Sequence, residues 1–314
     1  MRKMQRSNQS SVTEFILLGV SDKPWMNILL FILFLIIYMI ALVGNLILIT
    51  VSRLDSRLHT PMYFFLSNLS FLDICYTSSI VPKMLETFLA KKKTILFRDC
   101  AAQMYIYLSL GETECILLAV MAYDRYVAIC HPLRYTIIMN WRVCIIIAVG
   151  TWTGGFLLSI VHVAFTLTMP MCGHNVINHF LCEVPAVLSL ACVDTFINEI
   201  VIFVVGVLIL LIPVFLIFLT YIYIISTIMK ISSADGRSKA FSTCTSHLTV
   251  VTIFYGTAIF MYMAPKSSHS PDKDKMISVF YLIITPMLNP LIYSLRNQEV
   301  KGALRKITRK LGRQ

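Results

Sequence analysis

Charged side chains are scarce in this chain. Asp, Glu, Lys and Arg make up 14% of its 314 residues, whereas hydrophobic residues make up 57%. A typical soluble domain carries about 25% charged residues. The sequence also lacks an internal repeat and any Cys/His cluster with the spacing of a zinc site. These absences exclude an ordinary soluble domain and argue against a metal centre built from cysteine and histidine.

The chain has long apolar segments instead. A helix that crosses a membrane needs about 20 mainly apolar residues. Seven segments meet this requirement, and we expect helices near residues 26–51, 60–85, 98–127, 141–163, 197–228, 239–262 and 272–296. The sequence therefore predicts an all-α membrane protein, a seven-transmembrane helix bundle. We expect an N-terminal segment (1–25), the bundle (26–296) and a C-terminal amphipathic helix and tail (297–314).

The positions of basic residues predict the orientation in the membrane. With the N-terminus outside, the segments facing the cytosol carry a clear excess of Lys and Arg over Asp and Glu. Lys91, Lys92 and Lys93 lie on the outer side and weaken this argument. Much of the net charge of +11 lies in the C-terminal tail, where it suits anionic membrane lipid rather than nucleic acid. Asn8 begins a glycosylation sequon in the predicted extracellular segment.

A run at the end of the third predicted span carries the most information. Residues 121–132 read MAYDRYVAICHP and place an Asp–Arg pair where a long apolar segment ends. Further motifs lie in order along the chain: GN at 44–45, HTPMYFFL at 59–66, LSFLD at 69–73, SKAFSTC at 238–244 with SHL at 246–248, FYG at 254–256, and PMLNPLIYSLRN at 286–297. In this order the chain resembles the odorant receptors, which are rhodopsin-like (class A) G-protein-coupled receptors, of the tetrapod-type class II. The resemblance covers nearly the whole chain.

This resemblance implies a function and partners. Odorant receptors lie in the plasma membrane with the N-terminus extracellular and bind small volatile organic ligands within the bundle. They activate a heterotrimeric G protein of the stimulatory, olfactory type, which raises cAMP, and they need no catalytic residues of their own. A non-olfactory rhodopsin-like receptor is the first alternative, and the odorant-receptor motifs in spans two, three and six argue against it. A proton-coupled transporter is the second, and the lack of internal repeats argues against that.

The resemblance also assigns residues to G-protein coupling and activation. In this interpretation Asp124 holds Arg125 at rest, and Arg125 turns toward the G protein when the cytosolic helix ends separate. Pro290 removes one backbone hydrogen bond and kinks the last span, which provides a hinge for Tyr293. An anchoring charge pair and a static kink are the alternative interpretations. The full set assigned to this role is Asp124, Arg125, Tyr126, Tyr221, Asn289, Pro290 and Tyr293.

Two acids, Asp73 and Glu114, lie deep within predicted spans. An Asp at the middle of a bilayer costs about 2.5–3.5 kcal/mol, so such residues normally face the bundle interior. Close together, they would either share a proton or hold a cation. The resemblance matches Asp73 to a sodium-site aspartate and Glu114 to a glutamate typical of odorant receptors. A Na+ or proton site is therefore the one cofactor expectation, and a hydrogen-bonded structural pair is the alternative.

The ligand site is predicted from helical spacing in span three and from the resemblance elsewhere. We expect it to be mainly apolar, as suits a small neutral molecule. Glu112 departs from the family, which usually has a small or neutral residue there, so it either binds a cationic ligand or stays protonated and donates a hydrogen bond. Ordinary helix packing is the alternative for each member. The predicted lining residues are Met104, Tyr107, Leu108, Gly111, Glu112, Val205, Gly206, Ile209, Tyr255, Ala258, Ile259, Tyr262, Val279 and Leu282.

Four of the nine cysteines lie in predicted outer segments, where disulfides persist. Cys100, Cys172, Cys182 and Cys192 allow three connectivities, and the residues alone do not select one. The resemblance implies Cys100–Cys182, from the third helix to the second outer loop, and Cys172–Cys192 within that loop. The other five cysteines are expected to be thiols.

Overall fold

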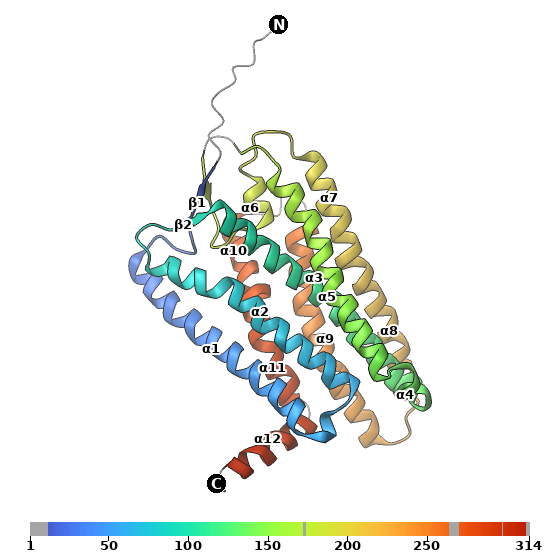
Figure 1. Cartoon of the computed structure of the whole chain (residues 1–314). Helices are drawn as coiled ribbons and strands as arrows, with labels where there is room; N and C mark the ends of the chain where they lie inside the picture. Colours follow the sequence, from blue (N-terminus) through green and yellow to red (C-terminus); the bar gives the residue numbers. More distant parts are fainter. Residues whose placement is uncertain (1–11, 172–173, 264–269, 297, 312–314) are drawn as a thin grey trace.

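A computed structural model of the chain describes residues 12–171, 174–263, 270–296 and 298–311. Within these residues, seven helical segments are long and apolar enough to cross a membrane, and they lie side by side as one bundle (Figure 1). Spans one to four are the single helices α1 (Pro24–Leu54), α2 (Pro61–Leu89), α3 (Phe97–Cys130) and α5 (Trp141–Leu167). Span six is α9 (Ala234–Met263). The predicted seven-helix fold is confirmed.

Spans five and seven each contain a π-helical turn, which the sequence did not predict. Span five consists of α7 (Phe196–Gly206), the π turn η3 (Val207–Leu211) and α8 (Ile212–Ile228). Span seven consists of α10 (Pro271–Val279), the π turn η5 (Phe280–Ile284) and α11 (Thr285–Arg296). Such turns often occur at functional sites, and residues of both turns line the cavity described below.

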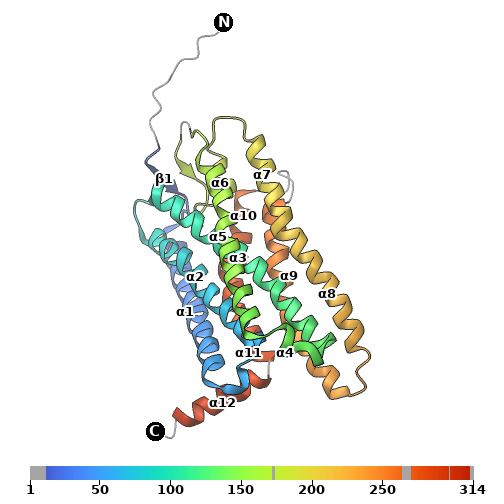
Figure 2. The ribbon, with the colours of Figure 1, turned by 45° about the vertical axis from the view of Figure 1, so that its right-hand side comes forward.

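Helix α3 is the central element of the bundle. It packs against α2, α5, α8 and α9, and Figures 1 and 2 show it crossing the bundle behind α5. The outward faces of α5 and α8 expose large apolar side chains, such as Ile146 at 70% and Phe218 at 63%. A soluble protein rarely exposes such continuous apolar surface. These faces are the surfaces that a bilayer would cover.

A small sheet lies at the end of the bundle near the N-terminus, and the all-α prediction did not include it. Strand β1 (Glu14–Leu17) pairs antiparallel with β2 (Thr94–Leu96) and parallel with β3 (Val176–Ile177). Phe15 and Leu17 of β1 are fully buried. The sheet thus joins the N-terminal segment, the link between α2 and α3, and the loop between spans four and five.

Short elements connect the helices. They are η1 (Ser56–Leu58), η2 (Pro132–Arg134), α4 (Tyr135–Ile138) and α6 (Val184–Leu188). Asp55 precedes η1 and accepts hydrogen bonds from the Arg57 side chain at 3.0 and 2.7 Å, which lowers the pKa of this carboxyl well below its usual range. The amphipathic C-terminal helix expected from the sequence is present as α12 (Gln298–Leu311). Its Val300 and Ala303 are fully buried, and the Tyr63 hydroxyl of α2 donates to Glu299 at 2.7 Å.

Candidate ligand-binding and coupling sites

A cavity of about 60 Å³ lies in the half of the bundle nearer the sheet, between α2, α3, α5, span five, α9 and span seven. Most of its wall is aliphatic or aromatic, as in other sites for small organic molecules. Its polar groups are tyrosine hydroxyls, a cysteine thiol, a carboxyl and an imidazole. The lining residues are Tyr76, Tyr107, Leu108, Gly111, Glu112, Cys115, His162, Ile202, Gly206, Ile209, Leu210, Phe254, Ala258, Tyr262 and Tyr281.

The cavity brings together part of the predicted ligand set. The predicted residues on its wall are Tyr107, Leu108, Gly111, Glu112, Gly206, Ile209, Ala258 and Tyr262. Six predicted residues are not among those that line it: Met104, Val205, Tyr255, Ile259, Val279 and Leu282. Among these six, Met104 and Leu282 are fully buried against other side chains. Contact of any of these residues with a ligand stays a prediction.

The loop between spans four and five contacts the cavity wall. The predicted Cys100–Cys182 disulfide is present and ties the loop to the start of α3. Gln103 of α3 accepts a hydrogen bond from the Cys182 backbone N–H at 3.1 Å, and the Tyr107 hydroxyl accepts one from Val184 at 3.2 Å. Because Tyr107 lines the cavity, the loop directly supports the cavity wall.

A buried acid of this loop, Glu183, joins it to span seven. Its carboxylate accepts hydrogen bonds from the Tyr281 hydroxyl at 2.6 Å and from Ser278 at 3.1 and 3.3 Å. His179 Nε2 lies 3.0 Å from Glu183 Oε2. Sequence reasoning missed this cluster. An acid directly after a disulfide cysteine was the available signal, but nothing in the sequence indicated its partners.

The second predicted disulfide and the glycosylation site cannot be compared with the structure. Cys172 and Asn8 lie outside the described residues, so the bridge and the glycosylation stay predictions. Met171 and Ala191 form an isolated antiparallel bridge, which brings the residues just before each predicted cysteine side by side. Cys75, Cys115, Cys130, Cys144 and Cys244 are free, as expected.

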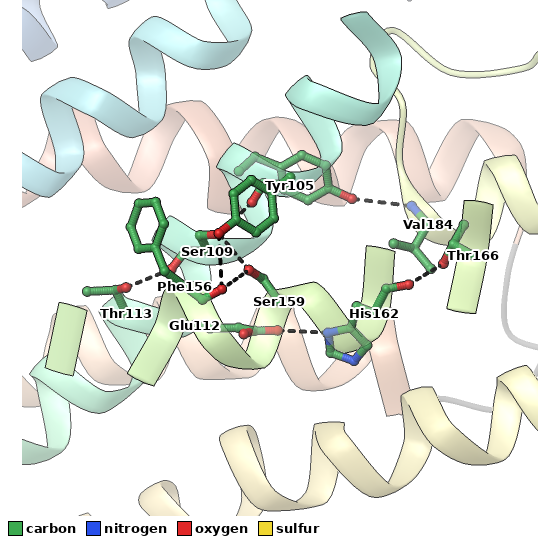
Figure 3. Close-up of polar contacts among 10 residues, drawn as sticks. Tyr105, Ser109, Glu112, Thr113, Phe156, Ser159, His162, Thr166 and Val184 are labelled. Atoms are coloured by element: carbon green, nitrogen blue, oxygen red, sulfur yellow. Dashed lines mark hydrogen bonds and ion pairs between the residues drawn. The ribbon is translucent and has the colours of Figure 1, made fainter. Parts of the chain in front are cut away.

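Glu112 has a partner that the sequence did not indicate. Glu112 Oε1 lies 2.7 Å from Nδ1 of His162 on α5, and both side chains are buried and line the cavity (Figure 3). His162 was missed because a single histidine in a long apolar span carries no sign of which neighbouring helix it faces. The pair lies on the cavity wall and joins α3 to α5.

The α3–α5 contact beside this pair is polar and unusually close. Ser109 and Ser159 share a hydrogen bond of 2.6 Å, and the Tyr105 hydroxyl donates to the Phe156 carbonyl at 3.2 Å (Figure 3). Gly155 of α5 makes the approach possible. A Cβ at this position would overlap Thr113 Oγ1 and lie 2.8 Å from both the Ser109 carbonyl oxygen and the Thr113 backbone nitrogen.

Below the cavity, two contacts join α9 to α3. The Tyr255 hydroxyl donates to the carbonyl of Cys115 at 2.7 Å, and Cys115 lines the cavity. His247 Nε2 lies 3.1 Å from the Leu118 carbonyl, and its Nδ1 lies 2.9 Å from the Tyr221 hydroxyl of α8. Predicted residues Tyr221 and Tyr255 therefore take part in helix contacts on the path from the cavity toward Arg125.

Arg125 and Asp124 do not pair as the sequence interpretation expected. Arg125 donates to the Thr243 carbonyl of α9 at 2.8 Å, and Asp124 accepts from the Tyr135 hydroxyl of α4 at 2.8 Å. Among the described residues no ion pair joins the two. Adjacent residues on a helix point about 100° apart, so each side chain meets a different neighbour. Tyr126 Oη lies 3.1 Å from His131 Nε2 at the same end of α3.

The Gly44–Asn45 motif of α1 accommodates Pro290 of α11. A proline leaves the carbonyl four residues earlier without its helical donor, and Asn45 donates to that carbonyl, Pro286 O, at 3.1 Å. A Cβ at Gly44 would lie only 3.0 Å from the Pro290 ring. The α1–α11 contact therefore accommodates the proline and replaces the helical hydrogen bond that it removes.

Asp73 lies beside this joint and is fully buried. It accepts hydrogen bonds from Asn289 Nδ2 at 3.2 and 3.0 Å. Both carboxyl oxygens of buried Glu114, and Asn289 Oδ1, have no hydrogen-bond partner among the described residues. Several oxygen atoms of these side chains therefore lack a hydrogen-bond partner. Oxygen ligands of this kind suit a hard cation such as Na+.

Comparisons with known proteins identify the family. A family model described as olfactory receptor matches residues 34–310. Over 304 residues the chain is 56% identical to Olfactory receptor 2D2 of Homo sapiens, a match that covers 97% of this chain and 98% of that protein. The chain belongs to the olfactory receptor family. Olfactory receptor 2G3 of Homo sapiens is 54% identical over 304 residues, with 97% and 98% coverage.

The fold agrees with this family assignment. The crystal structure of squid rhodopsin superposes with a TM-score of 0.68 at 20% identity, covering 92% of this chain and 87% of that chain. At that identity the likeness shows the fold alone. The chain is a multi-pass plasma-membrane protein of a family of G-protein-coupled signalling receptors, not enzymes. The narrower assignment to the tetrapod-type class II stays a prediction.

Proposed function

We propose that this olfactory receptor binds a small volatile organic molecule in the cavity and activates a stimulatory, olfactory-type G protein that raises cAMP. In this proposal the N-terminus, the sheet and the Cys100–Cys182 loop face outside, and α12 lies against lipid of the cytosolic leaflet. The single observation that carries the proposal is the mainly apolar cavity, which lies under a loop anchored by a disulfide and by buried hydrogen bonds.

The contacts between α3 and α9 suggest how ligand binding reaches the cytosolic side. A ligand that presses on the cavity wall at Cys115 or Ala258 shifts α9 relative to α3. That shift strains the Tyr255–Cys115 and His247–Leu118 contacts and then the Arg125–Thr243 bond. A ligand can only favour the open arrangement by binding it more tightly than the closed one.

Arg125 is the residue that this opening would release. It shares a small cavity with Tyr293, Thr243, Ser246 and Met121 at the cytosolic end. Arg125 Nε and the Tyr293 hydroxyl have no hydrogen-bond partner among the described residues. Both groups are thus available to a G-protein segment that enters when the Arg125–Thr243 bond breaks.

A cAMP-reporter screen of the expressed receptor against a chemically diverse odorant panel tests the proposal. Ala258→Phe places a large side chain in the cavity, whereas Ala164→Phe adds the same group on an exposed face of α5. We expect Ala258→Phe to abolish the response at normal surface expression and Ala164→Phe to preserve it. Equal responses in both variants would place the ligand elsewhere.

We propose further that Asp73, Glu114 and Asn289 hold a sodium ion. Their oxygen atoms would neutralise the positive charge and satisfy the buried carboxyl groups. Because a ligand that binds only the folded state stabilises it, Na+ should raise the Tm of purified receptor above that in N-methylglucamine. The Glu114→Gln variant should lose this difference. An equal Tm of the wild type in both salts would favour a shared proton instead.

A further inference from the structure

We infer that the free carboxyl oxygen of Glu112 selects ligands that carry a hydrogen-bond donor, such as a hydroxyl or amine, over carbonyl and ether compounds of the same shape. This inference rests on the proposed function, because it requires the ligand to occupy the cavity between α3, α5 and α9. It concerns a residue pair, Glu112 and His162, that lies on the cavity wall.

The geometry leaves one oxygen of Glu112 without a partner. Its Oε1 is taken up by His162 Nδ1 at 2.7 Å, whereas Oε2 is buried and makes no hydrogen bond within the described part of the chain. The Glu112 side chain is 6% exposed, so bulk water does not reach it freely. A buried polar atom of this kind destabilises the folded state until something bonds to it.

The proton shared by the pair determines what Oε2 can do. If the proton lies on His162, the pair is an ion pair, and Glu112 is a carboxylate whose oxygens only accept hydrogen bonds. If the proton moves along the short Oε1–Nδ1 contact to Glu112, it lies on Oε1, and Oε2 becomes the carbonyl oxygen. In both of these forms Oε2 is an acceptor, and its partner has to be a donor. A neutral pair in which Nδ1–H donates to Oε1 and the carboxyl proton lies on Oε2 would instead make Oε2 a donor, and a preference for the ether in the test below would reveal it.

This inference differs from the sequence-based expectation that a neutral Glu112 donates a hydrogen bond to an oxygen of the ligand. That expectation assumed a carboxyl with apolar neighbours alone. His162 favours a different arrangement, because a proton shared along the Oε1–Nδ1 contact leaves Oε2 as an acceptor.

Three of the four tyrosine hydroxyls on the cavity wall lie within hydrogen-bond distance of other protein groups. Tyr281 donates to Glu183 at 2.6 Å, and the Tyr107 hydroxyl accepts from the Val184 N–H at 3.2 Å. Tyr262 Oη lies 3.4 Å from Tyr281 Oη. Among the described lining residues, Glu112 Oε2 is the buried polar atom that lacks a partner. It is therefore the atom at which a ligand donor gains most.

Isomeric ligand pairs test this selection. Hexanol and methyl pentyl ether, or benzyl alcohol and anisole, have the same atoms but differ in the presence of an O–H donor. One hydrogen bond to a charged or polarised acceptor changes affinity roughly tenfold or more. In cAMP dose–response curves of the wild-type receptor, we expect the alcohol of a pair to be roughly tenfold more potent than the ether.

The variant for this test replaces both members of the pair. Glu112→Leu with His162→Phe removes the free oxygen without leaving an unpaired buried charge, a change that is often tolerated. The alcohol and the ether should then have equal potency. A matched control removes the neighbouring Ser109–Ser159 hydrogen bond by changing both to Ala. These serines are not among the residues that line the cavity, so the alcohol preference should remain.

The outcomes separate this inference from the proposed function. A wild-type receptor that responds to no compound of a broad panel contradicts the proposed function. A wild-type receptor that responds equally to both isomers, or better to the ether, overturns the inference alone. So does a well-expressed double variant that keeps the alcohol preference. If the double variant does not reach the cell surface, the isomer ratio of the wild type decides.

Discussion

The close contact between α3 and α5 predicts that Gly155 tolerates no side chain. Gly155→Ala adds a Cβ that overlaps Thr113 Oγ1 and lies 2.8 Å from two backbone atoms of α3. The threonine side chain can rotate away, but it then loses its 2.7 Å hydrogen bond to the Ser109 carbonyl. The backbone atoms cannot move without shifting α3 relative to α5.

The expected cost follows from three contributions. Forcing a methyl group into a packed interface costs about 1–3 kcal/mol, and the lost hydrogen bond costs about 1 kcal/mol. The better helix propensity of alanine offsets about 1 kcal/mol. The net expected destabilisation is therefore about 1–3 kcal/mol. Gly150→Ala on the same helix is the matched control, because a Cβ there meets nothing within 4 Å. Gly150→Ala should therefore gain only the better helix propensity of alanine.

Thermal unfolding of purified receptor in lipid nanodiscs, with surface expression as a second readout, measures the difference. We expect Gly155→Ala to lower the Tm and Gly150→Ala to leave it equal or higher. If Gly155→Ala were as stable as Gly150→Ala, the helices would not approach as closely as the structure has them. The position of His162 opposite Glu112 would then lose its support.

Three further predictions concern other parts of the chain. Arg125→Ala should abolish ligand-stimulated cAMP at near-normal surface expression, and full signalling by a well-expressed variant would contradict its coupling role. Mass spectrometry of non-reduced peptides should find Cys172 linked to Cys192, whereas a free thiol at Cys192 would reject that bridge. Asp55 has a lowered pKa because Arg57 binds its carboxylate, so its stabilisation is present at neutral pH and is lost as the pH falls below about 4. The acid side of a Tm–pH profile should therefore flatten in Asp55→Asn, and an unchanged profile would mean that the ion pair adds no stability.

The fold was predictable because the signals for membrane helices are local. Each span is an apolar segment of sufficient length, and prolines mark the first turns of α1, α2 and α10. The sheet was not predictable, since β1, β2 and β3 are very short and their pairing joins segments far apart in the chain. The π turns η3 and η5 also left no sign, because the apolar pattern continues through them.

The candidate site was predicted most completely on α3, although Met104 of the predicted set does not line the cavity. The four predicted residues at 107–112 share a face of α3, and all line the cavity. On spans six and seven the prediction was less accurate: Tyr255 bonds to a carbonyl of α3 instead of lining the cavity, whereas Tyr281, which was not predicted, does line it. The π turn η5, within which Tyr281 lies, changes which face of span seven points inward.

The sequence alone did not show which side chains pair with one another. Asp124 and Arg125 are neighbours in sequence, yet Tyr135 and Thr243 bind them. Glu112 stood out as an unexplained acid, yet its meaning depends on His162, fifty positions away on a helix brought close by Gly155. A buried charge in a membrane span therefore indicates that a partner exists, because leaving it unpaired is costly. Only the packing of the helices decides which residue that partner is, and for Glu112 it is His162.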